Sequence, residues 1–254
     1  MPVHTRYILC LLVIPLLLSC QRDEKQFTLL SHKRTGISFR NPIKEFPDFN
    51  SMAYNYMYNG AGVAAGDINN DNLVDLFFTG NFVGNRLYLN KGNFRFEDVT
   101  EKAGISSAEA WSNGAVMADV NGDGFLDIYV ANSTDQRQRL RKNFLFLNNG
   151  DLTFTEQAEE YGIADNAYST HSAFLDYDKD GDLDLFSLNH SVDKYAIFRE
   201  EFTQFRKSRD PWYGQKLYRN DGGSFTEGTS SAGIFNSALN FGLGVAIADF
   251  NGDH

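Results

Sequence analysis

The sequence is poor in cysteine, in proline and in positive charge, and each shortage excludes a class of protein. Both cysteines, Cys10 and Cys20, lie within the first twenty residues, so no disulfide or cysteine-based metal site can support the rest of the chain. Acidic residues outnumber basic ones by 33 to 23, and this net charge of −10 argues against a nucleic-acid partner and favours cations. The 22 glycines, 5 prolines and 14% aromatic residues favour short aromatic-rich strands joined by glycine turns.

A long apolar run stands at the N-terminus. Residues 7–18 (YILCLLVIPLLL) are too few to span a bilayer but match the length of a signal-peptide core. The run ends in Leu17-Leu18-Ser19-Cys20, which resembles the lipobox of bacterial lipoproteins. This resemblance implies a signal peptide over residues 1–19, lipidation of Cys20 and membrane attachment through the lipid anchor. A plain secretory signal and an uncut anchor are the alternatives.

The residues after the cysteine bear on location. Gln21-Arg22-Asp23-Glu24 resembles a short export signal of some Gram-negative lipoproteins, which implies an outer-membrane position facing the cell exterior; the alternative is an ordinary charged tether. Residues 20–50 are expected to form an N-terminal tether that contains an orphan outer strand at Phe27–Leu30, followed by Gly36-Ile37.

The remainder of the chain, residues 51–254, repeats itself. Three acidic segments align without gaps, and a fourth begins at Asp249 and stops at His254. Each follows a strand of small apolar residues, and each complete segment leads into a second, third and fourth strand with Asn/Gly hairpin turns. The acidic segments are 67–76 (DINNDNLVDL), 119–128 (DVNGDGFLDI) and 176–185 (DYDKDGDLDL). The expected first strands are 62–65, 114–117, 172–175 and 244–247; the second 75–78, 127–130 and 184–187; the third 85–90, 143–148 and 216–220; the fourth 94–97, 154–156 and 225–227.

Four strands in a fixed order predict an all-β fold, namely a partial β-propeller with about three complete four-stranded blades plus the start of a fourth. First strands built from small residues fit at the crowded central axis of a propeller, and aromatic residues are expected to pack between its blades. A solenoid stack or a two-sheet sandwich is the alternative, but a sandwich would not repeat four strands in one order. The stop within the fourth loop predicts a truncated piece of a longer propeller protein that associates through its open edges. A natural short chain that closes by oligomerising is the alternative.

Each of the three complete acidic segments carries oxygen-bearing side chains at positions 1, 3, 5 and 9. In a tight loop these oxygens converge, a carbonyl at position 7 joins them, and such a hard-oxygen set suits Ca²⁺ rather than Mg²⁺. An EF-hand needs Glu at position 12, where Phe78, Val130 and Ser187 stand, so that motif is excluded. Aspartates that cap turns without an ion are the alternative. The predicted ligands are Asp67, Asn69, Asp71, Leu73 (carbonyl) and Asp75; Asp119, Asn121, Asp123, Phe125 (carbonyl) and Asp127; Asp176, Asp178, Asp180, Asp182 (carbonyl) and Asp184; and, in the incomplete loop, Asp249, Asn251 and Asp253.

The loops and their flanking strands resemble the FG-GAP/VCBS repeats of integrin-type propellers. The stretch GVAAGDINNDNLVDLFFTGN…NRLYLNKGNFRFEDVTEKAGI is similar to bacterial repeat proteins that carry a C-terminal ASPIC/UnbV domain, and the likeness extends over roughly residues 27 to 254. It implies an extracellular, calcium-binding platform for binding, adhesion or assembly, with a glycan or an outer-membrane protein as partner and no catalysis. Two departures stand out: position 6 of the first loop is Asn72 instead of glycine, and the sequence contains no ASPIC/UnbV domain.

Candidates for catalysis are few. His171 and His190 flank the third loop and are expected to make polar contacts near the axis, with a catalytic base as the alternative. Tyr54, Tyr56 and Tyr58 alternate, so they are expected to line one strand face, as a packed blade edge or as a stacking surface. The alternative function is a polysaccharide-degrading enzyme component of the outer membrane. An acid/base pair in the axial channel would favour that enzyme, whereas a bare aromatic rim would favour binding.

Overall fold

The computed structural model describes residues 26–105, 107, 110–134, 141–192 and 202–252. It divides into two units, one ending at Ser31 and the other running from His32 to His254. The predicted signal peptide, Cys20 and Asp253 lie outside the described residues. Residues 27–31 form no strand, so the orphan strand expected at Phe27–Leu30 is absent from the described part of the first unit. Within the described ranges, no helix has the length and apolar character needed to cross a bilayer.

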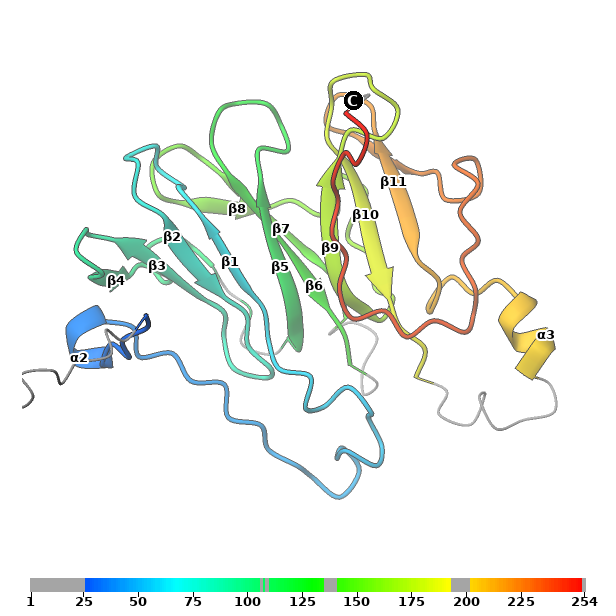
Figure 1. Ribbon diagram of the computed structural model, residues 1–254, viewed down its shortest axis with the longest axis horizontal. Coiled ribbons are helices and arrows are strands. Elements are labelled where there is room, and N and C mark those ends of the chain that lie inside the picture. The colour runs from blue at the N-terminus through cyan, green and yellow to red at the C-terminus, as the bar shows by residue number, and fades with distance from the viewer. Residues whose placement is uncertain (1–25, 106, 108–109, 135–140, 193–201, 253–254) are drawn as a thin grey trace, which may run out of the picture. The chain divides into compact units, whose positions relative to one another are not determined.

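Three four-stranded antiparallel sheets form the body of the second unit, and each is a meander in which consecutive strands pair (Figure 1). The predicted all-β arrangement of three four-stranded blades is thereby confirmed, and no closed ring is present in the described residues. The first sheet holds β1 (Val63–Gly66), β2 (Asp75–Phe78), β3 (Arg86–Asn90) and β4 (Phe96–Asp98). The second holds β5 (Ser112–Ala118), β6 (Asp127–Asn132), β7 (Phe144–Asn148) and β8 (Phe154–Glu156). The third holds β9 (Ser169–Leu175), β10 (Asp184–Asn189), β11 (Lys216–Asn220) and β12 (Phe225–Glu227), and the helices are α2 (His32–Thr35) and α3 (Phe202–Lys207).

The fourth repeat differs from the first three. The strand expected at 244–247 is not formed; ahead of it, Phe241 makes an isolated bridge with His190. Leu243 and Phe250 are 65% and 96% exposed. A β-strand needs a paired neighbour, and the described residues beyond this segment contain only the beginning of the next loop.

Apolar side chains fill the spaces between neighbouring sheets, because alternate residues of each strand point to opposite faces. On β6, Ile128 joins the cluster that contains Phe77 of the first sheet, whereas the next residue, Tyr129, joins the cluster that contains Leu185 of the third. Phe146 packs on the first side as well. The predicted packing of aromatic residues between blades is therefore correct.

The first strands lie side by side, β1 against β5 and β5 against β9. A Cβ atom on Gly62 would stand 2.6 Å from the carbonyl oxygen of Asn113, and one on Gly114 would stand 2.7 Å from that of Thr170. Both distances are far shorter than van der Waals contact, so only glycine permits this approach. The crowding explains why the predicted first strands are built from small residues.

A Gly-Ile pair recurs after each fourth strand and was expected to close that strand, but a short turn separates the two. The pairs are Gly104-Ile105, Gly162-Ile163 and Gly233-Ile234. In the turn after β8, the Ile163 amide donates to the Ala158 carbonyl, and the Tyr161 carbonyl accepts from the Phe225 amide of the next sheet. The glycine of this turn, Gly162, packs against the Phe225 carbonyl, and Gly36 after helix α2 packs in the same way against the Phe96 carbonyl of the first sheet. The N-terminal Gly-Ile pair is thus in phase with the repeats although its strand is not formed.

Candidate metal centres and the polar pocket at the opposite strand ends

The three complete acidic loops connect the first and second strands of their sheets and share one hydrogen-bond pattern. In the first loop, the position-1 carboxylate of Asp67 accepts the backbone N–H groups of Asp71 at 3.1 Å and Asn72 at 2.6 Å. The position-5 carboxylate of Asp71 accepts the N–H of Leu73 at 2.8 Å. The same contacts recur from Asp123 and Gly124 to Asp119, from Phe125 to Asp123, from Asp180 and Gly181 to Asp176, and from Asp182 to Asp180.

The loop backbone enters the left-handed region at positions 4 and 6. Position 6 has φ values of 91° at Gly124 and 99° at Gly181, and Asn72 takes the same place with φ 66°. Asparagine tolerates this region at a cost that glycine avoids. The departure noted at Asn72 therefore leaves the loop conformation intact. Position 4, occupied by Asn70 and Lys179 in two of the loops, is left-handed as well, which the spacing of aspartates did not indicate.

The position-9 aspartate fastens each loop to the third strand of its sheet. Asp75 is fully buried; its Oδ2 accepts the N–H of Ile68 at 3.0 Å and its Oδ1 accepts the N–H of Asn90, the last residue of β3, at 2.7 Å. Sequence reasoning assigned this residue only to metal binding. The repeating asparagine at the end of each third strand was the signal for the second role. The same pair of bonds joins Asp127 to Val120 and Asn148, and Asp184 to Tyr177 and Asn220.

Negative charge accumulates in the three complete loops, whose aspartates form no ion pair among the described residues. Burial raises the pKa of Asp127 to about 6, and the charges of Asp123 and Asp119 act in the same direction, while the two backbone N–H donors oppose them. Burial likewise raises the pKa values of Asp75 and Asp184.

The third loop concentrates carboxylates most tightly. One oxygen each from Asp176, Asp178 and Asp184 lies within 4.8 Å of the other two, whereas Asp180 is not part of this group. The backbone carbonyl at Asp182 is the expected position-7 donor, and its side chain accepts the Gly222 amide at 3.0 Å. Close, hard and anionic oxygens fit a divalent cation of the calcium type.

The other loops bring fewer charges together. In the first two, position 3 is an asparagine whose amide donates to position 5, from Asn69 to Asp71 at 3.1 Å and from Asn121 to Asp123 at 2.9 Å. In the fourth loop, the Asp249 carboxylate accepts the backbone N–H of Asn251 at 3.2 Å, and both residues are exposed. Its further ligand, Asp253, lies outside the described residues.

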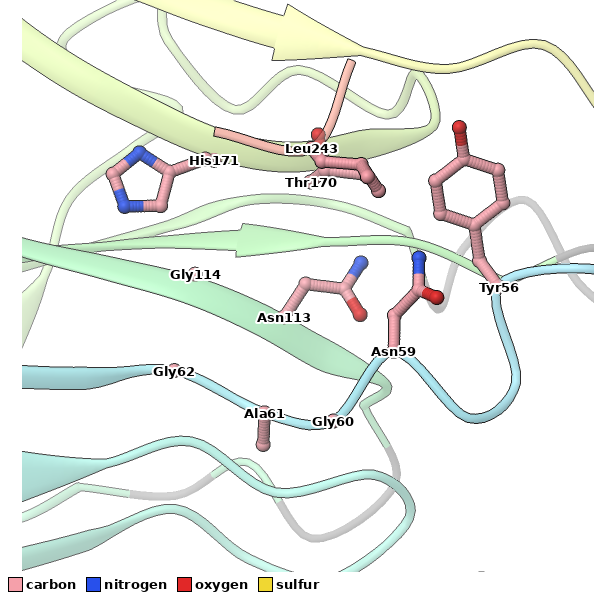
Figure 2. Close-up of a pocket in the computed structure, with 10 residues that line it drawn as sticks. All are labelled: Tyr56, Asn59, Gly60, Ala61, Gly62, Asn113, Gly114, Thr170, His171 and Leu243. Atoms are coloured by element: carbon pink, nitrogen blue, oxygen red, sulfur yellow. The ribbon is translucent and has the colours of Figure 1, made fainter. Parts of the chain in front are cut away.

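A pocket of about 310 Å³ lies where the first strands begin, at the ends opposite the loops (Figure 2). His171 contributes its imidazole, whose pKa is lowered by burial and whose Nδ1 is buried without a hydrogen-bond partner among the described residues. The lining contains neither a carboxylate nor a lysine or arginine. The lining residues are Tyr56, Asn59, Gly60, Ala61, Gly62, Asn113, Gly114, Thr170, His171 and Leu243.

His190 lies behind this pocket in an aromatic cluster. It is fully buried, stacks on Tyr56 with ring centroids 3.7 Å apart, and places Nε2 2.8 Å from the Ser133 Oγ. Burial lowers its pKa to about 4. Both His190 and Ser133 are buried and neither lines the pocket, so His190 makes the polar contacts expected of it, whereas His171 lines the pocket and its Nδ1 lacks a hydrogen-bond partner among the described residues.

The alternating tyrosines do not form a strand face, which corrects the sequence interpretation. Residues 54–58 lie in a turn segment, where Tyr54 and Tyr56 are buried and Tyr58 is 64% exposed. Tyr54 packs edge-on against Trp111, with ring centroids 5.7 Å apart. The tyrosines at every second position matched the pattern of a strand, but a turn can also direct successive side chains to different sides.

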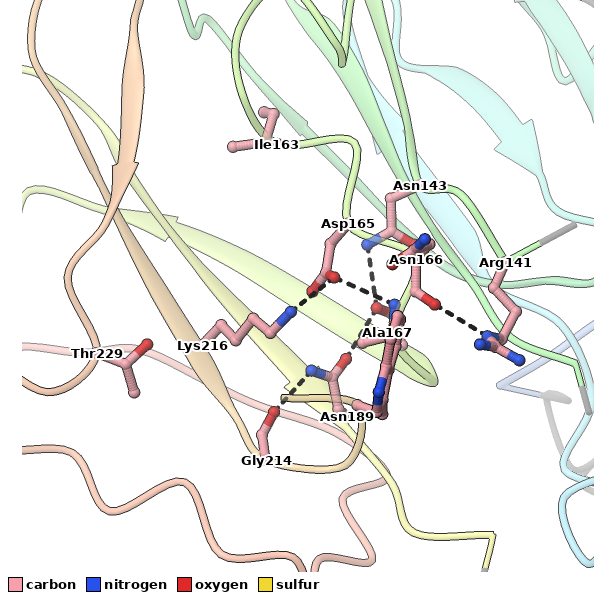
Figure 3. Close-up of polar contacts among 12 residues, drawn as sticks. Arg141, Asn143, Ile163, Asp165, Asn166, Ala167, Asn189, Gly214, Lys216 and Thr229 are labelled. Atoms are coloured by element: carbon pink, nitrogen blue, oxygen red, sulfur yellow. Dashed lines mark hydrogen bonds and ion pairs between the residues drawn. The ribbon is translucent and has the colours of Figure 1, made fainter. Parts of the chain in front are cut away.

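A second polar cluster, between the second and third sheets, is structural (Figure 3). Lys216 Nζ and Asp165 Oδ1 form a buried ion pair at 2.7 Å. Asn143 donates to the Ser169 Oγ at 3.0 Å, and Arg141 donates to the Asn166 carbonyl at 2.9 Å. These bonds satisfy buried polar groups that link the two sheets.

Comparison with known proteins points to the segment that holds the three complete loops. A family model described as FG-GAP-like repeat matches residues 67–130 and 119–187. The chain is 28% identical over 203 residues to cartilage acidic protein 1 of Xenopus tropicalis, a match that covers 80% of this chain and 28% of that protein. It is 29% identical over 136 residues to cartilage acidic protein 1 of Mus musculus, with 51% and 20% covered. The chain therefore spans less than a third of the length of these relatives. The resemblance inferred from the sequence is confirmed: this protein carries FG-GAP-like repeats.

Proposed function

We propose that this chain is a calcium-braced binding or adhesion module. The observation that carries the proposal is the convergence of Asp176, Asp178 and Asp184: one carboxylate oxygen of each lies within 4.8 Å of the other two, and none of the three forms an ion pair among the described residues. Carboxylates this close repel each other unless a cation lies between them. Two further loops share the hydrogen-bond pattern of the third.

Calcium would supply charge neutralisation and cross-linking at these loops. In each, the ligands would be the side chains at positions 1, 3, 5 and 9 with the carbonyl at position 7. Because the position-9 aspartate also holds the third strand through a backbone amide, an ion bound there would brace two strands of one sheet.

Binding rather than chemistry is supported by the pocket at the opposite strand ends. It offers His171 but no carboxylate to act with it as an acid/base pair. The runner-up, a polysaccharide-degrading enzyme component of the outer membrane, would need such a pair.

Calorimetry on the full chain, stripped with EDTA and titrated with CaCl₂, tests the calcium proposal. We expect binding heat that MgCl₂ does not reproduce and that weakens in Asp178→Asn. Asp151→Asn, an exposed aspartate outside the loops, is the matched control and should bind normally. Absence of calcium heat from correctly folded protein would disprove the proposal.

The proposed location is the outer membrane, facing the exterior, through a lipid on Cys20, with a glycan or an outer-membrane protein as partner. Cys20→Ala should yield unprocessed or soluble protein without incorporated palmitate, while Cys10→Ala should be processed normally. Cys20→Ala protein of mature size recovered in the membrane fraction at the wild-type level would rule the anchor out.

A further inference from the structure

We infer that the pocket at the beginnings of the first strands binds one neutral sugar ring. The inference rests on the proposed function only in taking a glycan as the class of partner. Nothing in the FG-GAP-like loops forms part of this pocket, which lies at the other end of the same strands.

The lack of charged side chains in the pocket restricts the class of ligand. No lysine or arginine lines the pocket to pair with a carboxylate or phosphate, and no aspartate or glutamate lines it to pair with an amine. Burying a charged ligand group without a partner is costly, so a neutral ligand is favoured. This neutrality contrasts with the chain as a whole, whose net charge is −10.

The polar groups of the pocket suit hydroxyls. Asn59 and Asn113 turn their carboxamides toward the same space, with Tyr56 at its side (Figure 2). In the described part of the chain, the Asn59 side chain and the Tyr56 hydroxyl make no hydrogen bond, and Asn113 uses only its Nδ2, toward the Ser169 carbonyl at 2.9 Å. Carboxamides and phenols both donate and accept, as do sugar hydroxyls.

The walls and the size of the pocket suit a single ring. Gly60, Gly62 and Gly114 line the pocket without side chains that could fill it, and Leu243 supplies an apolar patch. The volume of about 310 Å³ lies at the lower end of the range of about 300–1,000 Å³ that small-molecule sites occupy. A longer glycan would therefore insert one terminal ring and leave the rest outside.

Tyr56 is held in place by contacts that do not use its hydroxyl. Its ring stacks on His190, and His190 is anchored by Ser133. The hydroxyl can therefore be removed by Tyr56→Phe while the stack remains. This separates a ligand contact from a packing contact.

The test is saturation-transfer NMR on the full chain in 1 mM CaCl₂ with glucose, galactose, mannose and N-acetylglucosamine, and with the neutral tripeptide Gly-Ser-Gly. We expect transfer to the ring protons of at least one sugar. Each of Asn59→Ala and Tyr56→Phe should weaken binding by about five- to tenfold, the effect of one lost hydrogen bond. Matched controls in the same segment are Asn55→Ala and Tyr58→Phe, which alter exposed side chains outside the pocket and should leave binding unchanged.

Three results would overturn the inference: no transfer to any sugar of the panel, binding of the tripeptide in place of sugars, or sugar binding that Asn59→Ala and Tyr56→Phe leave unchanged. Calcium calorimetry on the same samples separates the two proposals. Calcium binding without sugar binding refutes the pocket alone, and sugar binding without calcium binding refutes the calcium loops alone.

Discussion

The first strands β1, β5 and β9 end in loops crowded with aspartates and begin around a pocket that has no charged lining residue. At the loop end, buried Asp127 has a raised pKa because its charge is desolvated and lies near other carboxylates. At the pocket end, buried His190 has a lowered pKa and is held neutral among tyrosines. The two proposals divide along the same line, with calcium bracing proposed at one end of the strands and ligand binding at the other.

The largest effect should come from removing a position-9 aspartate. Asp127→Ala leaves the buried amides of Val120 and Asn148 without acceptors, and we expect a loss of about 4 kcal/mol in unfolding free energy. Urea unfolding in EDTA measures this loss independently of calcium. Asp123→Ala, an exposed aspartate of the same loop, is the control and should cost much less. Equal losses would mean that the two backbone bonds of Asp127 stabilise the fold no more than the contacts of the exposed Asp123 do.

Acidification should destabilise the pocket end. His190 has a folded pKa of about 4 against 6.5 for the unfolded chain, so the unfolded state binds the proton first. Its contribution is fully present above pH 6.5 and is lost as the pH falls toward 4, by about 3 kcal/mol in all. The raised pKa of Asp127 acts in the opposite direction in EDTA, since its folded form keeps a proton that the unfolded chain has released.

The difference between wild type and His190→Asn isolates the histidine. Urea unfolding at pH 7 and at pH 4.5 should show a smaller acid loss in the variant than in the wild type. Identical pH dependence in the two proteins would contradict the assignment.

Calcium should stabilise the loop end by a smaller amount. With a site Kd near 10⁻⁴ M, about 1 mM calcium adds about 1.4 kcal/mol per occupied loop. The third loop, with acidic side chains at all four ligand positions, should bind most tightly, and Asp180→Ala should weaken it. Calorimetry that finds the same affinity in Asp180→Ala would contradict this ranking and would confine the ligands to the converging group Asp176, Asp178 and Asp184.

The smallest expected effect concerns the first loop. Asn72 has φ 66° where the other loops have glycine, so Asn72→Gly should stabilise the protein by about 0.5 kcal/mol. Gly124→Ala adds a Cβ atom at the equivalent left-handed position of the second loop and should destabilise the protein by about 1 kcal/mol. Thermal melting in EDTA measures both, and a loss of stability in Asn72→Gly would show that the asparagine side chain contributes more than its backbone strain costs.

The sequence by itself determined the repeat. Small residues before DxNxDxxxD-type segments and apolar strands after them specified three four-stranded meanders, because strand periodicity and turn chemistry are local properties. The ends of β2, β8, β11 and β12 fall where the pattern placed them. The expected strands at Phe27–Leu30 and 244–247 are absent from the described residues, because a strand also requires a neighbour that the local pattern does not supply.

Only the tertiary structure decided what the aspartates and tyrosines contact. The spacing in the loops identified ligand types, but the second bond of Asp127 goes to Asn148, which ends the next strand along the chain, β7. The pocket joins Tyr56, Asn113 and His171 from three segments that come together only when neighbouring sheets pack at their glycines. Such contacts depend on distances between repeats, which arise from packing and are not encoded within any one repeat.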